Sequence, residues 1–499
     1  MKKLALLSAL ALLGTPLAAR EPNSSPNAAE AAAHHQLSLI AQLDDSGPML
    51  NAVIVTNPNA PGEARDASNG GLPLGGRTIL VKDNIETREW PTTAGSLALK
   101  DNATGRDAPL ITRLRAAGGV VLGKTNLSEW ANIRDNNSTS GWSAVGGLTR
   151  NPHATDRSAC GSSAGSGAAV AAGLAWAAIG TETNGSITCP ASINGIVGFK
   201  PTVGMVSRTH VVPISASQDT AGPMANSVHD AALLLSAIAG GDPLDPATAE
   251  AGKYATDFTQ GLAEYSLRGV RIGVMVKQAG SRSKVDALFD RAMEDLERAG
   301  AVLVPIDYDW PDEFWPNSLT VLLFELRRDM NAYLATLPDP AMPDTLTDLV
   351  AFNYAHGDRE LRWFGQDLFE KALQTTDEEA YRKALAMVQH ATREDGIDRI
   401  MAEYDVSFLI APTVGPAWTM DLVNGDNFGG DIGAGSLPAI AGYPHLTVPM
   451  GAVEGLPVGL SFMGAKWQDH EVLKAGAAYE RARTAKLPAP SFKPWQPAE

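Results

Sequence analysis

Residues 180–190 read GTETNGSITCP, a run of polar and small side chains between two segments with the composition of buried chain. The preceding residues 168–180 are AAVAAGLAWAAIG, and the following residues 193–199 are INGIVGF. Polar groups inside a protein cost free energy unless they are hydrogen-bonded, hydrated or used in chemistry. The stretch therefore indicates a solvated loop, a tightly hydrogen-bonded turn or a reactive site.

Short apolar segments and amphipathic segments alternate on both sides of this loop. Val/Ile/Leu-rich segments predict β-strands over residues 50–56, 78–85, 120–125, 270–276, 301–307, 406–413, 445–451 and 456–464. Helical signals occur over residues 28–43, 108–119, 167–179 and 283–300, and another begins near residue 470. Alternating strands and helices are typical of an α/β fold, so we expect one large domain over residues 20–499 built on a largely parallel or mixed sheet.

Residues 311–402 differ from this pattern, because Trp, Phe, Leu and charged residues recur there at helical spacing with few strand signals. We predict a helical insertion. Four aromatic residues lie in or beside it, namely Trp310, Phe314, Trp315 and Trp363. One hypothesis is that they border a substrate cleft, and the alternative is ordinary packing between helices.

Composition and charge exclude several classes of partner. The chain has 499 residues, of which 44% are hydrophobic and 19% charged, and its net charge is −16 with no basic stripe. Nucleic acids and anionic membranes are therefore poor partners. Beyond the N-terminus, no segment reaches the roughly 18 apolar residues needed for a membrane span.

The N-terminus has the pattern of an export signal. Lys2 and Lys3 precede the apolar run LALLSALALLG, and small residues follow around Ala18 and Ala19. This order is typical of a signal peptide, which we place at residues 1–19, so we expect a periplasmic or secreted protein. An oxidising compartment permits a disulfide between the two cysteines, Cys160 and Cys189, but the sequence leaves open whether they pair.

Other catalytic motifs fit the chain less well. Residues 161–165 (GSSAG) match the G-x-S-x-G nucleophile elbow of α/β-hydrolases with Ser163 as nucleophile, and His445 and His470 lie downstream. However, no buried strand precedes this motif. His34–His35 and the two cysteines lack metal-ligand spacing, and no phosphate-binding loop is present, so we expect neither metal nor cofactor.

Three segments taken together favour a different chemistry: residues 81–84 (VKDN), 160–166 (CGSSAGS) and 180–187 (GTETNGSI). Lys82 ends an apolar strand, where desolvation lowers the pKa of a lysine and makes its neutral amine available as a base. Ser162 and Ser186 lie 24 positions apart (186 − 162). In this order and at this spacing, the segments resemble the amidase signature family. Residues 126–132 (NLSEWAN), 138–142 (STSGW) and 180–208 are most similar to bacterial peptide amidases.

The resemblance implies a large twisted mixed β-sheet with helices on both faces and a Ser-Ser-Lys triad. In it, Ser186 attacks the amide carbonyl and forms an acyl-enzyme, while Ser162, on a cis peptide bond, relays the proton to neutral Lys82. The oxyanion hole is expected from the backbone N–H groups of Thr183, Asn184, Gly185 and Ser186. The implied substrate is a small amide or an amidated peptide, with no cofactor and no obligatory protein partner.

Two departures from the family pattern bear on the backbone of the oxyanion turn and on the substrate. Many members have Gly at the position of Asn184, and many carry an Arg shortly after the nucleophile, where this chain has Thr188 and Cys189. The missing Arg favours neutral amides over acidic ones. Alternatives remain open: an amidase like the amidotransferase subunit that delivers ammonia to charged tRNA, the Ser163 hydrolase, and a non-catalytic periplasmic binding protein.

Overall fold

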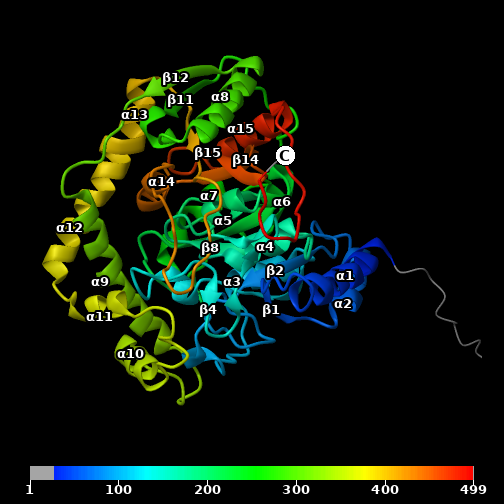
Figure 1. The fold of residues 1–499 in the computed structure, drawn as a ribbon, viewed down its shortest axis with the longest axis vertical. Helices are drawn as coiled ribbons and strands as arrows, with labels where there is room; N and C mark the ends of the chain where they lie inside the picture. The colour runs from blue at the N-terminus through cyan, green and yellow to red at the C-terminus, as the bar shows by residue number, and fades with distance from the viewer. Residues whose placement is uncertain (1–26, 498–499) are drawn as a thin grey trace, which may run out of the picture.

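The computed structural model describes residues 27–497, and the predicted signal peptide lies outside the described residues. An 11-stranded β-sheet forms its centre (Figure 1). In spatial order its strands are β1 (Val53–Thr56), β3 (Val120–Thr125), β2 (Thr78–Lys82), β8 (Ala177–Glu182), β10 (Thr220–Ala225), β9 (Val197–Lys200), β14 (His445–Val453), β15 (Leu456–Met463), β13 (Phe408–Pro412), β11 (Arg271–Met275) and β12 (Val302–Ile306). Two small hairpins pair β4 (Trp142–Ser143) with β5 (Gly147–Leu148) and β6 (Arg150–Asn151) with β7 (Ala154–Ser158).

The sheet is mixed, as predicted. Strand β2 runs parallel to β3 and β8, and β11 runs parallel to β12 and β13. The remaining pairs of the large sheet are antiparallel. Strands from both ends of the chain therefore complete one sheet, which is why no boundary divides it.

Each face of the sheet carries its own apolar core, because successive side chains of a strand point to opposite faces. In β2, Ile79 and Val81 belong to one core and Leu80 to the other. The first core is covered by α3 (Pro109–Ala116), α6 (Val228–Ile238), α8 (Ser283–Arg298) and α15 (Asp469–Ala482). The second is covered by α1 (Ala28–Leu39), α2 (Ala60–Asn69), α4 (Ala164–Ala171) and α5 (Thr188–Ile193). The predicted α/β class with helices on both faces is confirmed.

The helical insertion lies between β12 and β13. It consists of α9 (Phe314–Leu334), α10 (Leu346–Ala355), α11 (Asp367–Gln374), α12 (Glu378–Thr392) and α13 (Arg399–Glu403). In Figure 1 its helices lie along the side of the molecule opposite α1 and α2. Helix α12 packs on α9 and on α14 (Ser436–Ala441), while the short α7 (Ala251–Tyr254) follows α6.

The helix predicted over residues 167–179 is wrong in its second half. Helix α4 ends at Ala171, Gly173 takes a left-handed conformation with φ +74°, and Ala177–Glu182 forms strand β8. A left-handed glycine is a common helix stop. The small residues of this segment allow close packing of the strand and do not extend the helix. A Cβ at Gly180, for example, would lie 2.8 Å from Ser163 Oγ and 2.9 Å from Met224 Sδ.

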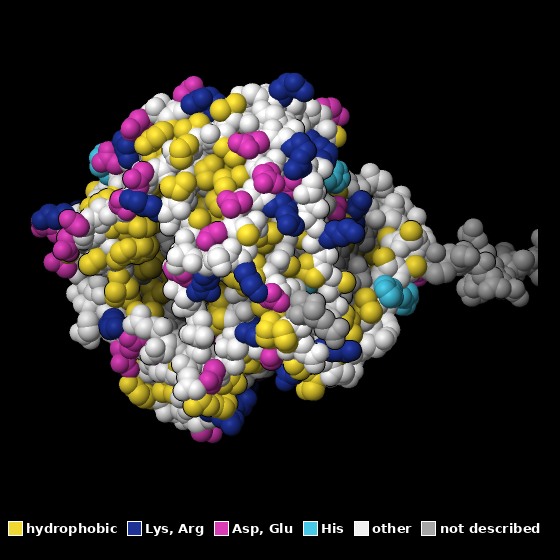
Figure 2. Space-filling view, turned by 45° about the horizontal axis from the view of Figure 1, so that its top comes forward, with side chains coloured by type: hydrophobic (Ala, Val, Ile, Leu, Met, Phe, Trp, Pro, Cys, Tyr) yellow, Lys and Arg dark blue, Asp and Glu magenta, His cyan; other side chains and the backbone are white. Residues whose placement is uncertain are grey.

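Charge is distributed without a single-sign area on the face drawn in Figure 2, where acidic and basic side chains are interspersed with apolar ones. None of the helices in the described part of the chain has the length and apolar character to cross a membrane.

Candidate active site

Lys82 is the last residue of β2, a strand buried along its whole length. Because it follows Leu80 by two positions, its side chain leaves the sheet on the face that α4 covers. The side chain is fully buried. The sequence motif thus places an amine inside the protein, next to the segment that opens α4.

Two neighbouring buried lysines have different partners. On β3, Lys124 forms an ion pair with Asp83, with Nζ 2.8 Å from Oδ1. Lys82 instead donates from Nζ to Ser162 Oγ (2.7 Å), Thr181 Oγ1 (2.8 Å) and the Thr181 carbonyl (3.3 Å). Over residues 27–497, no carboxylate lies within ion-pair distance of Lys82. Its surroundings therefore solvate an amine without fixing it as a cation.

Burial lowers the pKa of Lys82 from its ordinary 10.5 to about 7, although the carboxylates of Asp219 and Glu182 act in the opposite direction. Desolvation disfavours the ammonium form, and the distant carboxylates do not offset it. The neutral form of Lys82 is therefore accessible near neutral pH. A neutral amine in this position can accept the proton of Ser162.

Ser162 follows a cis peptide bond from Gly161, as the resemblance implied. It is fully buried, and its carbonyl accepts a hydrogen bond from the Ser128 backbone N–H (3.0 Å). Gly161 is required by space, since a Cβ there would lie 2.1 Å from Ser128 Oγ. The backbone N–H of Ser163 donates to the Ser186 carbonyl (3.1 Å), which joins the two serine segments.

Ser186 lies in the turn between β8 and α5. In the described chain, the backbone N–H groups of Thr183, Asn184, Gly185 and Ser186 donate to no protein acceptor. These are the four groups predicted for the oxyanion hole. The left-handed residue of the turn is Gly185, with φ +82°, and Asn184 keeps a negative φ, so the substitution of Gly by Asn at 184 costs no backbone strain.

Two acidic side chains, Glu182 and Asp219, accept hydrogen bonds from residues of this turn. Glu182 Oε2 accepts the N–H groups of Ile187 (2.8 Å) and Thr188 (2.9 Å), and so satisfies the free donors at the start of α5. Thr183 Oγ1 donates to Asp219 Oδ1 (2.5 Å). Glu182 and Thr183 therefore support the turn, which leaves Ser186 and the free N–H groups available to a ligand.

Ser162 and Ser186 line one cavity of about 580 Å³. Much of its remaining lining comes from residues 131–140, the segment 160–189, residues 413–418 and the loop before α14. Among the described residues, the helical insertion contributes only Leu322 of α9. The hypothesis that the insertion's aromatic residues border this cleft is wrong: Trp310, Phe314 and Trp315 pack on one another, and Trp363 lies beside Arg362.

The nucleophile-elbow interpretation fails on geometry. Ser163 is fully buried, and its Oγ donates to the Thr181 carbonyl (3.1 Å) and accepts from the Thr181 N–H (3.2 Å). The two downstream histidines contact other groups, His445 Nε2 contacting Ser461 Oγ (2.6 Å) and His470 Nε2 the Gln260 carbonyl (2.8 Å). Ser163 thus has a structural role, and no histidine of the described chain reaches it.

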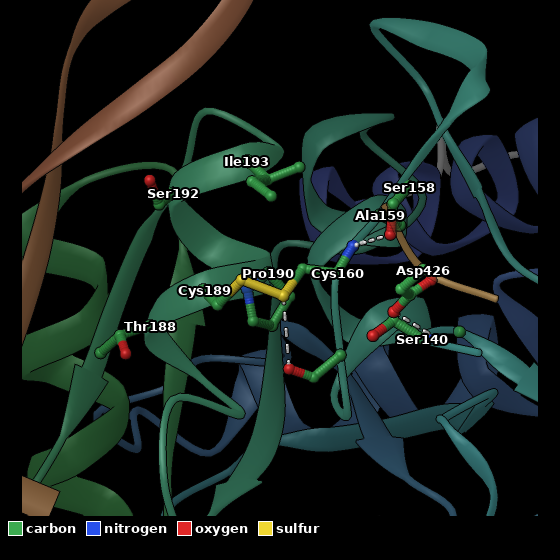
Figure 3. Close-up of a disulfide and its surroundings, with 12 residues drawn as sticks. Ser140, Ser158, Ala159, Cys160, Thr188, Cys189, Pro190, Ser192, Ile193 and Asp426 are labelled. Atoms are coloured by element: carbon green, nitrogen blue, oxygen red, sulfur yellow. Dashed lines mark hydrogen bonds between the residues drawn. A yellow bond between two sulfur atoms is a disulfide. The ribbon is translucent and has the colours of Figure 1, made fainter. Parts of the chain in front are cut away.

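Cys160 and Cys189 form a disulfide, with their Cα atoms 6.1 Å apart (Figure 3). The sequence alone leaves this pairing open. Cys160 lies two residues before Ser162, and Cys189 lies three residues after Ser186. Both cysteines line the cavity, so the disulfide ties the two serine segments together beside the site.

We expect the disulfide to contribute to stability. Replacing both Cys160 and Cys189 with serine removes a cross-link over a sequence separation of 29, which corresponds to about 3–4 kcal/mol in the chain-entropy treatment. The thermal unfolding midpoint should fall, and wild-type protein treated with dithiothreitol should show the same lowered midpoint. Equal midpoints for oxidised, reduced and double-variant protein would contradict this expectation.

Residues 27–497 contain no cluster of three or more His, Cys, Asp or Glu side chains that could hold a metal ion. Two cavity residues, Asn132 and Asp426, were not predicted from the sequence. Asn132 lies within the NLSEWAN segment, and Asp426 lies in the Gly-rich segment 425–435, which has the composition of a plain loop. Neither segment has a periodicity that would reveal its role.

Known proteins resemble this chain over most of its length. The amidase family matches it over residues 37–473. The crystal structure of peptide amidase from Stenotrophomonas maltophilia is 46% identical, with a TM-score of 0.88, and the match covers 93% of this chain and 95% of that one.

Two sequence relatives extend the comparison. A protein of Arabidopsis thaliana named a probable amidase is 35% identical over 476 residues, which is 89% of this chain and 85% of its own. A glutamyl-tRNA(Gln) amidotransferase subunit of Cupriavidus metallidurans is 33% identical over 477 residues, covering 90% of this chain and 93% of its own. From these matches and the shared α/β architecture, the chain belongs to the amidase signature family and is an amidohydrolase that acts on amides.

Proposed function

We propose that this enzyme hydrolyses the C-terminal amide of peptides with a Ser186–Ser162–Lys82 triad. The observation that carries the proposal is the buried Lys82 amine, which has no carboxylate partner within the described chain and lies 2.7 Å from Ser162 Oγ. A lysine in that environment can accept a proton at neutral pH.

The steps follow from these positions. Ser186 Oγ attacks the amide carbonyl carbon while its proton passes through the Ser162 hydroxyl to Lys82 Nζ. The oxyanion accepts hydrogen bonds from the free N–H groups of residues 183–186. Collapse breaks the C–N bond, and the leaving nitrogen takes the proton back through Ser162 and departs as ammonia. Water then attacks the acyl-enzyme by the same relay, which releases the carboxylate and restores Ser186.

Support for a peptide substrate comes from the cavity and from one relative. No Lys or Arg side chain of the described residues lines the cavity, so nothing there neutralises a substrate carboxylate. The 46%-identical Stenotrophomonas maltophilia protein is a peptide amidase. The similarity to the amidotransferase subunit keeps a second candidate, an enzyme that passes ammonia to a partner instead of releasing it.

A substrate panel tests the proposal with the purified protein alone. We expect ammonia release from an amidated dipeptide to have a higher kcat/KM than release from a fatty amide or a simple aromatic amide. If glutamine were the best substrate, and if its hydrolysis needed a second protein, the amidotransferase candidate would replace this one. If no amide released ammonia, both would fall.

Activity should depend on pH through Lys82. Because the pKa of Lys82 is lowered to about 7, the neutral base dominates above pH 7. We expect kcat/KM to rise about tenfold per pH unit below 7 and to level off above it. An N-acetylated peptide amide should be used, since it has no ionisable amine of its own.

Asp219 is a buried acid near this site whose titration could also produce a rise of kcat/KM with pH, so it needs a control. Burial raises the pKa of Asp219 to about 6. In the Asp219→Asn variant, the rise of kcat/KM should persist with its midpoint below that of wild type, because the Asp219 carboxylate raises the pKa of Lys82. A midpoint that disappears in Asp219→Asn would assign the rise to Asp219 and remove Lys82 from that role.

A further inference from the structure

The catalytic cavity has an unusual charge distribution. Among the described residues that line it, only Asp426 carries a charged side chain. Lys82 lies behind Ser162 and does not reach the lining. A substrate in this cavity therefore meets one negative charge and no compensating cation from the described chain.

Asp426 is held in a defined position with one oxygen unused. Its Oδ2 accepts the backbone N–H of Ser140 at 3.0 Å, a contact that Figure 3 shows. Its Oδ1 is buried and has no hydrogen-bond partner among the described residues. A carboxylate oxygen that is removed from water and left without a donor costs free energy. Because Asp426 as a whole is only partly buried, a rotation of its side chain turns Oδ1 toward the cavity, where a ligand donor recovers that cost.

Two other buried polar atoms of the cavity lining also lack partners in the described chain. Asn132 Oδ1 is an acceptor, and Trp418 Nε1 is a donor. Trp418 packs against Phe428, with ring centroids 5.0 Å apart, and both rings line the cavity. Acceptors for amine and peptide N–H groups, a donor for a carbonyl, and an apolar wall together suit a short peptide that carries a positive charge.

The backbone that carries Asn132 is also in an uncommon conformation. Trp130, Ala131 and Asn132 adopt left-handed φ values of 51°, 53° and 73° in succession. Non-glycine residues rarely take this conformation, and such outliers concentrate at ligand-binding sites. The conformation brings Ala131 and Asn132 to the cavity wall.

From these observations we propose that Asp426 forms a subsite for a cationic amine of the amide substrate, in the first instance the free N-terminal ammonium group of a short amidated peptide. This inference rests on the proposed function and names its substrate class. A charge-assisted hydrogen bond from the ammonium group would satisfy Asp426 Oδ1. The same charge would disfavour substrates with a nearby carboxylate, in agreement with the absence of a lining cation among the described residues.

The test compares matched substrates in wild-type protein and in Asp426→Asn. Asparagine keeps an acceptor for the Ser140 N–H but removes the charge. The first pair is an amidated dipeptide with a free N-terminus and its N-acetyl form. In wild type we expect the free form to have a kcat/KM about 10- to 100-fold higher, the range of a hydrogen bond to a charged group. In Asp426→Asn the two forms should differ less than about threefold.

A second pair identifies the source of the amine. Both members are N-acetylated peptide amides and differ in the residue before the amide. Lysine at that position carries a positive charge on its side chain, and norleucine carries none. Dependence on Asp426 in the first pair alone assigns the subsite to the N-terminus. Dependence in the second pair alone would overturn that assignment in favour of a basic side chain.

Control variants distinguish a failure of the Asp426 subsite from a failure of the proposed function. Asp431 lies in the same loop but pairs with Arg282 at 2.9 Å and does not line the cavity, so Asp431→Asn should preserve the preference. Asp426→Glu should restore part of it. If wild type hydrolyses neither peptide amide, the proposed function fails. If it hydrolyses both and the preference is unchanged in Asp426→Asn, the subsite inference alone is overturned.

Discussion

The Ser186→Ala variant should lose amide hydrolysis almost completely, with kcat/KM falling by about 10⁴-fold or more. Ser186 lines the cavity beside the free N–H groups of its own turn and the segment that carries Ser162. Alanine leaves the oxyanion donors in place but removes the atom that forms the acyl-enzyme. The variant should therefore still bind peptide amides while releasing no measurable ammonia.

Ser163→Ala is the matched control, because it removes a hydroxyl one residue from Ser162. Ser163 Oγ bonds only to the backbone of Thr181 in the described chain. Its loss should lower stability by about 1–3 kcal/mol, as expected for buried hydrogen-bonding groups left unsatisfied, and should leave kcat/KM within about tenfold of wild type. The opposite result, activity lost in Ser163→Ala and kept in Ser186→Ala, would make Ser163 the nucleophile.

The sequence predicted the strands on both sides of the sheet's centre, because those segments are strongly apolar, and missed the adjacent strands β8, β10 and β9. Strands β2 and β3 fall within the predicted segments, since residues 78–82 and 120–125 are buried on both faces. Strand β10 was not predicted, because TAGPMA has little strand propensity. Its Gly222 is required by close approach, as a Cβ there would lie 2.2 Å from the Phe199 carbonyl. Tertiary contacts of this kind leave no local pattern.

In the candidate site, too, residues in sequence motifs were predicted and residues placed by tertiary contacts were not. Lys82, Ser162 and Ser186 were predicted because their motifs recur in a fixed order, and the structure brings the first two within 2.7 Å. Asp426 and Asn132 were missed because their roles depend on which loops the fold brings to the cavity. The disulfide could not be predicted either, since a separation of 29 residues does not determine a distance in space.

Lys82→Met should be nearly as inactive as Ser186→Ala, with kcat/KM lowered by about 10³- to 10⁴-fold, because Lys82 is the group that takes the Ser162 proton in the proposed mechanism. Lys82→Met should also stabilise the protein, whereas most substitutions of a buried residue destabilise it. The pKa of Lys82 is about 7 in the folded protein, against the ordinary 10.5. The charged lysine therefore lowers the free energy of unfolding at pH values below 7, and this cost declines as the pH rises to 10.5. Methionine fills a similar volume without charge, so the unfolding midpoint at pH 6 should rise.

Lys82→Arg separates charge from basicity. Arginine keeps a positive group with hydrogen-bond donors but does not become neutral in this pH range, so it cannot accept the proton. We expect this variant to be as inactive as Lys82→Met and less stable, because it forces a permanent cation into a site with no carboxylate partner among the described residues. Substantial activity in Lys82→Arg would mean that the site needs the charge of Lys82 and not its neutral amine, and the base would have to be sought elsewhere.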